Sequence, residues 1–133
     1  MVPVLVGDLT PGEVDGLKRA LRDAEASSGL TFSLFLGLAE GDPAEHAARL
    51  HGQLAHPAES VVVLCDPESR SLEIVTGSRA KYALSDDQAT LAAASMRSNF
   101  VAGNILGGLE QGLRQLGQGA RKPPTLHTFA DLS

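Results

Sequence analysis

The residues best suited to chemistry lie where an apolar strand gives way to a turn, between Cys65 and Arg70. A cysteine followed by an arginine is typical of a phosphatase loop, in which a thiolate attacks phosphorus while the arginine and backbone amides hold the oxygens. Here the spacing is one residue short, and the carboxylates of Asp66 and Glu68 stand between the two residues and would repel a phosphate. We therefore expect Cys65 to be a buried strand residue.

Hard oxygen ligands for a divalent cation are a second chemical option. Calcium and magnesium prefer carboxylate and amide oxygens, which could come here from Asp66, Asp86, Asp87 and Asn104. The chain lacks the Asp-x-Asp-x-Asp-Gly spacing of a calcium loop. Asp66 also suits a turn, and Asp86 and Asp87 suit the first turn of a helix, where the helix dipole favours negative charge. A Ca or Mg site and purely structural roles are both open on this pattern.

Cationic and aromatic side chains gather shortly after the second strand of this region. Arg79, Lys81 and Tyr82 follow that strand, and Arg70 lies in the turn before it. If the strand ends meet there, these donors could bind a small anion or an acidic peptide. The alternative is a solvated loop with no ligand.

The histidines do not predict a metal site. His46 and His51 are five residues apart, which places them on different faces of a helix, whereas a zinc pair needs a spacing near four. We expect both to face solvent.

The elements that position these residues begin with clear capping signals. Thr10 and Glu13 have the spacing of a capping box, Pro11 suits the first helical position, and Gly29 suits the left-handed conformation that ends a helix. Similar starts recur twice later in the chain, each followed by apolar residues every three or four positions. We predict helices over residues 11–28, 43–55, 86–98 and 100–116.

Short apolar runs between these helices predict three strands, over residues 30–38, 61–65 and 72–76. A hairpin-length turn separates the last two, so we expect an antiparallel pair with Cys65 buried. The element order is α-β-α-β-β-α-α. A single mixed sheet sandwiched by helices, an α/β fold, is the simplest architecture that buries these faces. We assign residues 1–118 to this domain and 119–133 to a proline-containing linker and C-terminal tail.

Composition and charge exclude several classes of function. A chain of 133 residues with 43% apolar residues suits one domain, and a formal charge of −5 argues against nucleic acid as a partner. No apolar run reaches the roughly 20 residues that span a bilayer, and the start of the chain lacks the features of a signal peptide. The single cysteine agrees with a reducing compartment. We expect a soluble, cytoplasmic protein.

The strand–turn–strand ending at Gly77, with the later segment from Asn99 to Leu109, resembles the TPM domain, a family that includes a thylakoid acid phosphatase. It is more similar still to a related actinobacterial family of unknown function. The resemblance covers roughly residues 8–118. It implies an α/β/α sandwich, often secreted or membrane-anchored, in which some members bind calcium or hydrolyse phosphate esters. Asn104 stands where many TPM domains carry an aspartate, which removes one charge from the implied metal site.

These observations favour a binding or scaffolding module without catalysis, because no nucleophile lies beside a base and no cofactor loop follows a strand. Its partner would be another protein or a small ligand, and glycines spaced four apart in the last helix offer a homodimer interface as an alternative to close packing within the chain. The alternative function is a divalent-metal-assisted phosphatase that uses Asp66, Asp86 and Asp87. The tail carries Leu126, Phe129 and Leu132 at intervals of three, so it either docks as a short helical turn or is a frayed end.

Overall fold

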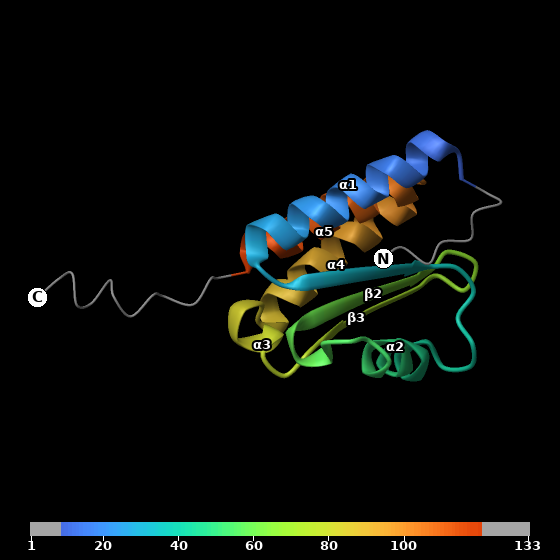
Figure 1. Cartoon of the computed structure of the whole chain (residues 1–133). Helices are drawn as coiled ribbons and strands as arrows, with labels where there is room; N and C mark the ends of the chain where they lie inside the picture. The colour runs from blue at the N-terminus through green and yellow to red at the C-terminus, as the bar shows by residue number, and fades with distance from the viewer. Residues whose placement is uncertain (1–8, 121–133) are drawn as a thin grey trace, which may run out of the picture.

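A central sheet organises the protein. A computed structural model describes residues 9–120, and in this part of the chain one three-stranded mixed sheet is covered by helices on both faces (Figure 1). The strands are β1 (Thr31–Leu36), β2 (Ser60–Asp66) and β3 (Ser71–Thr76). The helices are α1 (Pro11–Ser28), α2 (Pro43–Gly52), α3 (Ala80–Ala83), α4 (Asp86–Val101) and α5 (Ile105–Gly119), with a 3-10 turn η2 (Pro57–Glu59). The predicted α/β class and element order are confirmed, and η2 and α3 are short additions.

The parallel pairing of β1 and β2 places the carboxyl ends of these two strands at the same end of the sheet. β1 runs parallel to β2, with Leu36 opposite Cys65, and β3 runs antiparallel to β2, with Ser71 opposite Asp66. The predicted hairpin is therefore confirmed, and Cys65 in it is 1% exposed. The carboxyl ends of β1 and β2 and the β2–β3 turn all lie at the same end of the sheet (Figure 1).

Helices α1, α4 and α5 cover one face of the sheet, and α2 lies on the other (Figure 1). The core between sheet and helices is aliphatic, with Leu17, Phe32, Val63, Met96, Leu109 and Leu113 among its fully buried members. Glycine permits the close helix approach: a Cβ on Gly117 would overlap the Ala24 backbone, and one on Gly112 would overlap Met96. These two glycines therefore serve contacts inside the chain, whereas the homodimer remains a prediction.

The capping signals act as predicted. The Thr10 hydroxyl accepts a hydrogen bond from the Glu13 amide (3.1 Å), the Glu13 carboxylate accepts one from the Thr10 amide (2.8 Å), and Gly29 ends α1 with a φ of 76°. Ser85 and Gln88 form the same capping box at the start of α4. These contacts satisfy backbone amides that the first helical turn leaves without partners.

The bounds of three helices differ from the sequence-based expectations. The predicted helix over residues 43–55 ends at Gly52, and the one over 86–98 continues to Val101. The predicted helix over 100–116 begins only at Ile105, because Gly103 adopts a φ of 86° and turns the chain.

The expectation that His46 faces solvent was wrong. This side chain is 6% exposed and packs edge-on against Phe35 of β1, with 5.1 Å between the ring centroids. Its Nδ1 atom accepts a hydrogen bond from the Glu40 amide at 3.0 Å. His46 lies beside the buried Ala47 on α2, so it joins the side of the helix that rests on the sheet.

Residues 9–120 contain no helix that is both long enough and apolar enough to cross a membrane. The tail positions Leu126, Phe129 and Leu132 lie outside the described residues, as does most of the segment assigned to linker and tail.

Candidate functional site

A concave feature of the described chain lies at the carboxyl ends of β1 and β2. It is a cleft of about 490 Å³ between the β2–β3 turn and the corner that joins α4 to α5, and we call it the main cleft. Arg70, Arg97, Asp66 and Ser71 contribute polar groups, and the apolar wall consists of Leu72, Phe100, Val101 and Ile105. In open α/β sheets, this end of the parallel strands is where ligands bind.

A second depression, of about 270 Å³, adjoins the first, and we call it the side hollow. Both are lined by Asp66, Pro67 and Ile105, so they meet along that border. The side hollow is mostly apolar, and its walls include Leu9, Leu36, Leu38 and Leu106. Its charged lining residues are Asp66 and Glu68. We call the two depressions together the groove.

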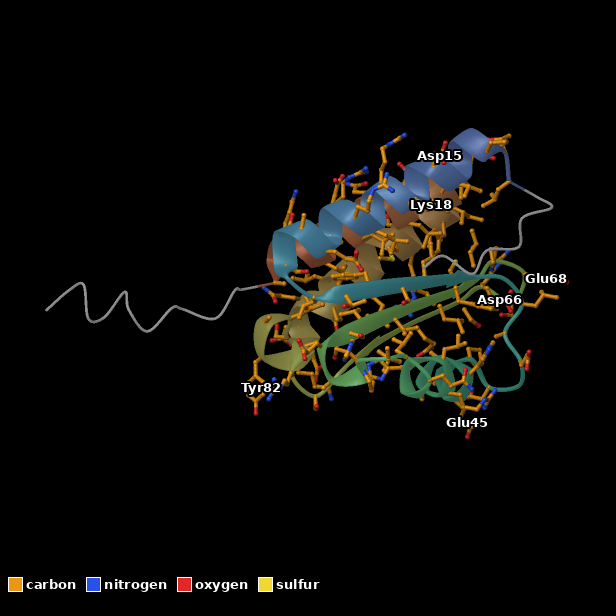
Figure 2. All side chains as sticks on the ribbon, viewed as in Figure 1. Asp15, Lys18, Glu45, Asp66, Glu68 and Tyr82 are labelled. Atoms are coloured by element: carbon orange, nitrogen blue, oxygen red, sulfur yellow. The ribbon has the colours of Figure 1, made fainter. Side chains whose placement is uncertain are left out.

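Asp66 connects the loop after β1 to the β2–β3 turn at the rim of the groove. Its Oδ2 atom accepts a hydrogen bond from the Ala39 amide (2.9 Å), and its Oδ1 atom accepts bonds from the Glu68 and Ser69 amides (3.0 and 3.2 Å). These donors, the Ala39 amide first, hold the pKa of Asp66 below its ordinary value of 3.8, although burial acts in the opposite direction. The side chain is 3% exposed, and Figure 2 places it at the turn beside Glu68. Asp66 is thus an ionised clamp between two loops.

Arg70 is placed by the geometry of the β2–β3 turn. It is the only non-glycine residue in the described chain with a positive φ, at 58°. This left-handed conformation costs an ordinary residue about 1 kcal/mol or more, so the turn holds Arg70 at the mouth of the main cleft against a local preference.

Arg97 is the residue that sequence reasoning missed. It lies near the end of α4, and its guanidinium donates a hydrogen bond to the Leu72 carbonyl oxygen at 3.1 Å, which aims the side chain across the main cleft toward β3. Within residues 9–120, the ion pairs involve Arg114 with Asp23 and Glu110, and neither Arg70 nor Arg97. Two arginines therefore line the cleft without a carboxylate partner among these residues.

Cys65 also lines the main cleft, but its environment opposes reactivity. Burial, with a smaller contribution from the neighbouring Asp66 charge, raises the pKa of Cys65 to about 12. A thiol with such a pKa stays protonated near neutrality, and the thiolate is the nucleophilic form.

The other candidate residues lie elsewhere. Arg97, near the end of α4, hydrogen-bonds to Leu72 at the end of the sheet that carries Asp66. Asp86 lies eleven residues before Arg97, which is about 16 Å along the helix. Asp86 is therefore near the opposite end of the sheet from Asp66. Asp87 follows Asp86 in the first turn of α4, so neither joins Asp66. Within residues 9–120, no group of three or more His, Cys, Asp or Glu side chains could hold a metal ion.

The remaining predicted metal ligand, Asn104, serves as a helix cap, and most of the predicted anion ligands lie apart from Asp66. Asn104 borders the groove through its neighbour Ile105, but its side chain caps α5 by accepting a hydrogen bond from the Gly107 amide at 3.2 Å. Tyr82 lies at the end of the molecule opposite Asp66 (Figure 2), on the short helix α3 with Lys81 and next to Arg79. Of the four predicted anion ligands, the cleft therefore includes Arg70 alone.

Comparison with known proteins places the chain in a family. Residues 9–117 match a domain described as "Domain of unknown function (DUF5130)". The chain belongs to this family. An uncharacterized protein of Mycobacterium tuberculosis, found in strains H37Rv and CDC 1551, is 27% identical over 103 residues. That alignment covers 77% of this chain and 62% of the relative, so the DUF5130 chain matches less than two thirds of its relative's length.

Solved structures with the same fold come from several bacteria. The BA42 protein of Bizionia argentinensis matches with a TM-score of 0.76 and 22% identity, over 86% of this chain and 83% of BA42. The N-terminal domain of a P. gingivalis protein also matches with a TM-score of 0.76, at 17% identity, over 89% and 80% of the two chains. The N-terminal domain of the cg2496 protein of Corynebacterium glutamicum gives 0.73 at 15% identity, over 93% and 83%. These likenesses support the fold alone, and the resemblance to the TPM domain stays a prediction.

Proposed function

We propose that this DUF5130 domain is a binding module without catalysis and that its ligand occupies the main cleft. The observation that carries the proposal is the pair of arginines, Arg70 and Arg97, set beside an apolar wall at the carboxyl ends of β1 and β2. The ligand has an anionic group for the two guanidinium groups and an apolar part for the wall. A carboxylate fits this pair because arginine presents parallel N–H donors to two oxygens.

The charges around the main cleft favour the binding of an anionic ligand. Asp66 is the one acidic residue among those that line the cleft, and both of its carboxylate oxygens already accept hydrogen bonds from backbone N–H groups. Arg97 uses one nitrogen on the Leu72 carbonyl and retains further N–H donors for a ligand. In a chain with a formal charge of −5, this cleft is a locally cationic site.

Catalysis has less support from the same geometry. A nucleophile needs a base within hydrogen-bond reach, and in residues 9–120 no side-chain hydrogen bond joins Cys65 to a histidine. His46 packs on Phe35 and accepts from Glu40, outside the residues that line the cleft.

Titration of the full chain with hexanoate, followed by amide NMR shifts, tests the proposal. Hexanamide has the same chain length without the charge and serves as the matched probe. We expect hexanoate to shift the amides of Ser71, Leu72 and Val101 more strongly than hexanamide, and the response to weaken as salt screens the charges. Arg97→Gln should abolish the difference between the probes, whereas Arg79→Gln, at the other end of the sheet, should preserve it. Equal responses to both probes would reject the proposal.

The metal-assisted phosphatase remains the competing function from the family resemblance. It requires Asp66 and Asp86 to share one metal ion, yet they lie toward opposite ends of the sheet. Turnover of p-nitrophenyl phosphate by the full chain with calcium, magnesium or manganese, abolished by Asp86→Ala in a folded protein, would replace the binding proposal with this one.

A further inference from the structure

The groove divides chemically into two parts. The main cleft carries Arg70 and Arg97, whereas the side hollow is walled by leucines from three separate segments of the chain. The two parts meet at Asp66, Pro67 and Ile105, so one elongated ligand could occupy both. A small carboxylic acid held by the arginines would leave the side hollow in contact with water.

Exposed apolar side chains mark both parts of the groove. Val101 is 90% exposed and lines the main cleft, and Leu38 is 56% exposed and lines the side hollow. The other large apolar side chains exposed within residues 9–120, Tyr82 and Leu91, line neither depression. Contiguous apolar surface with a charged rim marks sites where proteins bind one another.

We infer that the occupant of the groove is an extended segment of another protein that carries an acidic and an apolar side chain on the same side. This inference rests on the proposed function, because Arg70 and Arg97 take the acidic side chain. The apolar side chain enters the side hollow against Leu38 and Leu106. In an extended chain, every second side chain points the same way at a repeat of roughly 6.6 Å. Because the two depressions share a border, we assign the two anchoring residues the shortest same-side spacing, two positions.

The charge of Glu68 also restricts which residue of the segment can enter the side hollow. Glu68 lies on the border of the side hollow and repels a second acidic residue there. The segment therefore places its carboxylate at the main cleft only, and a neutral apolar residue at the side hollow.

Fluorescence anisotropy with the full chain tests the inference. The probes are short labelled peptides with Leu, Ile, Phe or Val two positions from Asp or Glu, in either order, on a Gly/Ser/Ala background. We expect at least one peptide to bind about tenfold more tightly than hexanoate, and replacement of its acid by the amide to weaken binding about tenfold. Leu38→Ser should weaken binding about fivefold, because it removes apolar contact from an already exposed position.

Leu91→Ser is the matched control, since it makes the same change at another exposed leucine outside the groove. If hexanoate binds but no peptide binds more tightly, or if Leu38→Ser and Leu91→Ser behave alike, this inference is wrong and the proposed function stands. If neither hexanoate nor any peptide binds, both are wrong. If the free protein is a dimer that Leu38→Ser dissociates and Leu91→Ser does not, the occupant is a second copy of the chain, and the inference of a foreign segment is overturned.

Discussion

Replacement of Asp66 by asparagine distinguishes a structural clamp from a ligand for metal or substrate. The substitution preserves shape but replaces one acceptor oxygen with an NH₂ group. In the wild type, Oδ2 serves the Ala39 amide and Oδ1 serves the Glu68 and Ser69 amides. Whichever way the asparagine turns, at least one backbone N–H then faces another N–H.

The expected cost follows from those contacts. A hydrogen bond to a charged acceptor contributes about 1.5–3 kcal/mol, and a buried donor left without a partner costs about 1–3 kcal/mol. We expect Asp66→Asn to lower the free energy of unfolding by about 3 kcal/mol without any added metal. Asp42→Asn is the matched control: Asp42 caps α2 by accepting from the Glu45 amide at 3.1 Å, and asparagine caps a helix about as well as aspartate.

Urea denaturation over a range of pH provides the assay. Because the folded pKa of Asp66 is lowered, its contribution to stability is present above the ordinary value of 3.8 and is lost as the pH falls through the folded pKa. The gap between wild type and Asp66→Asn should thus be constant near neutrality and narrow in acid. A variant as stable as the wild type at neutral pH, or a gap that does not change in acid, would refute the clamp.

Three further substitutions test other parts of the account. Thr10→Ala should cost about 1 kcal/mol of unfolding free energy in a denaturant titration, because the capping bond at α1 is lost; an unchanged midpoint would mean that the cap does not form. Gly77→Ala should cost at least about 2 kcal/mol, because a Cβ there would overlap the Pro57 carbonyl oxygen, whereas Gly52→Ala, which has open space, should cost nothing. Arg70→Gly should raise the melting temperature slightly yet weaken hexanoate binding. Glycine removes about 1 kcal/mol of left-handed strain, and its greater backbone freedom in the unfolded chain cancels about half of that gain. A lower melting temperature would contradict that assignment of strain.

Local signals in the sequence predicted the elements well. The capping box of Thr10 and Glu13 spans only four positions, and β2 is apolar at every position from Val61 to Cys65, so neighbouring residues determine both structures. The later start of α5 depends on a single left-handed residue, Gly103, which an apolar periodicity does not reveal.

The site was harder to predict because its contacts are distant in sequence. Arg97 bonds a carbonyl 25 residues away, and Asp66 bonds an amide 27 residues away. Arg97 belongs to no recognisable motif. The one hint in the sequence is a cationic residue placed between the apolar Met96 and Phe100 of the same helix. His46 was misplaced for a related reason, since its burial depends on Phe35 in another element.

A charge reversal at Arg97 is the sharpest test of whether the arginines of the main cleft bind an anionic group. Hexanoate and hexylammonium would be titrated into the wild type and into Arg97→Glu, with amide shifts at Ser71 and Val101 as the readout. We predict that the wild type binds hexanoate in preference to hexylammonium and that Arg97→Glu, with an unchanged fold, reverses the preference. Undiminished binding of hexanoate by Arg97→Glu would contradict this prediction.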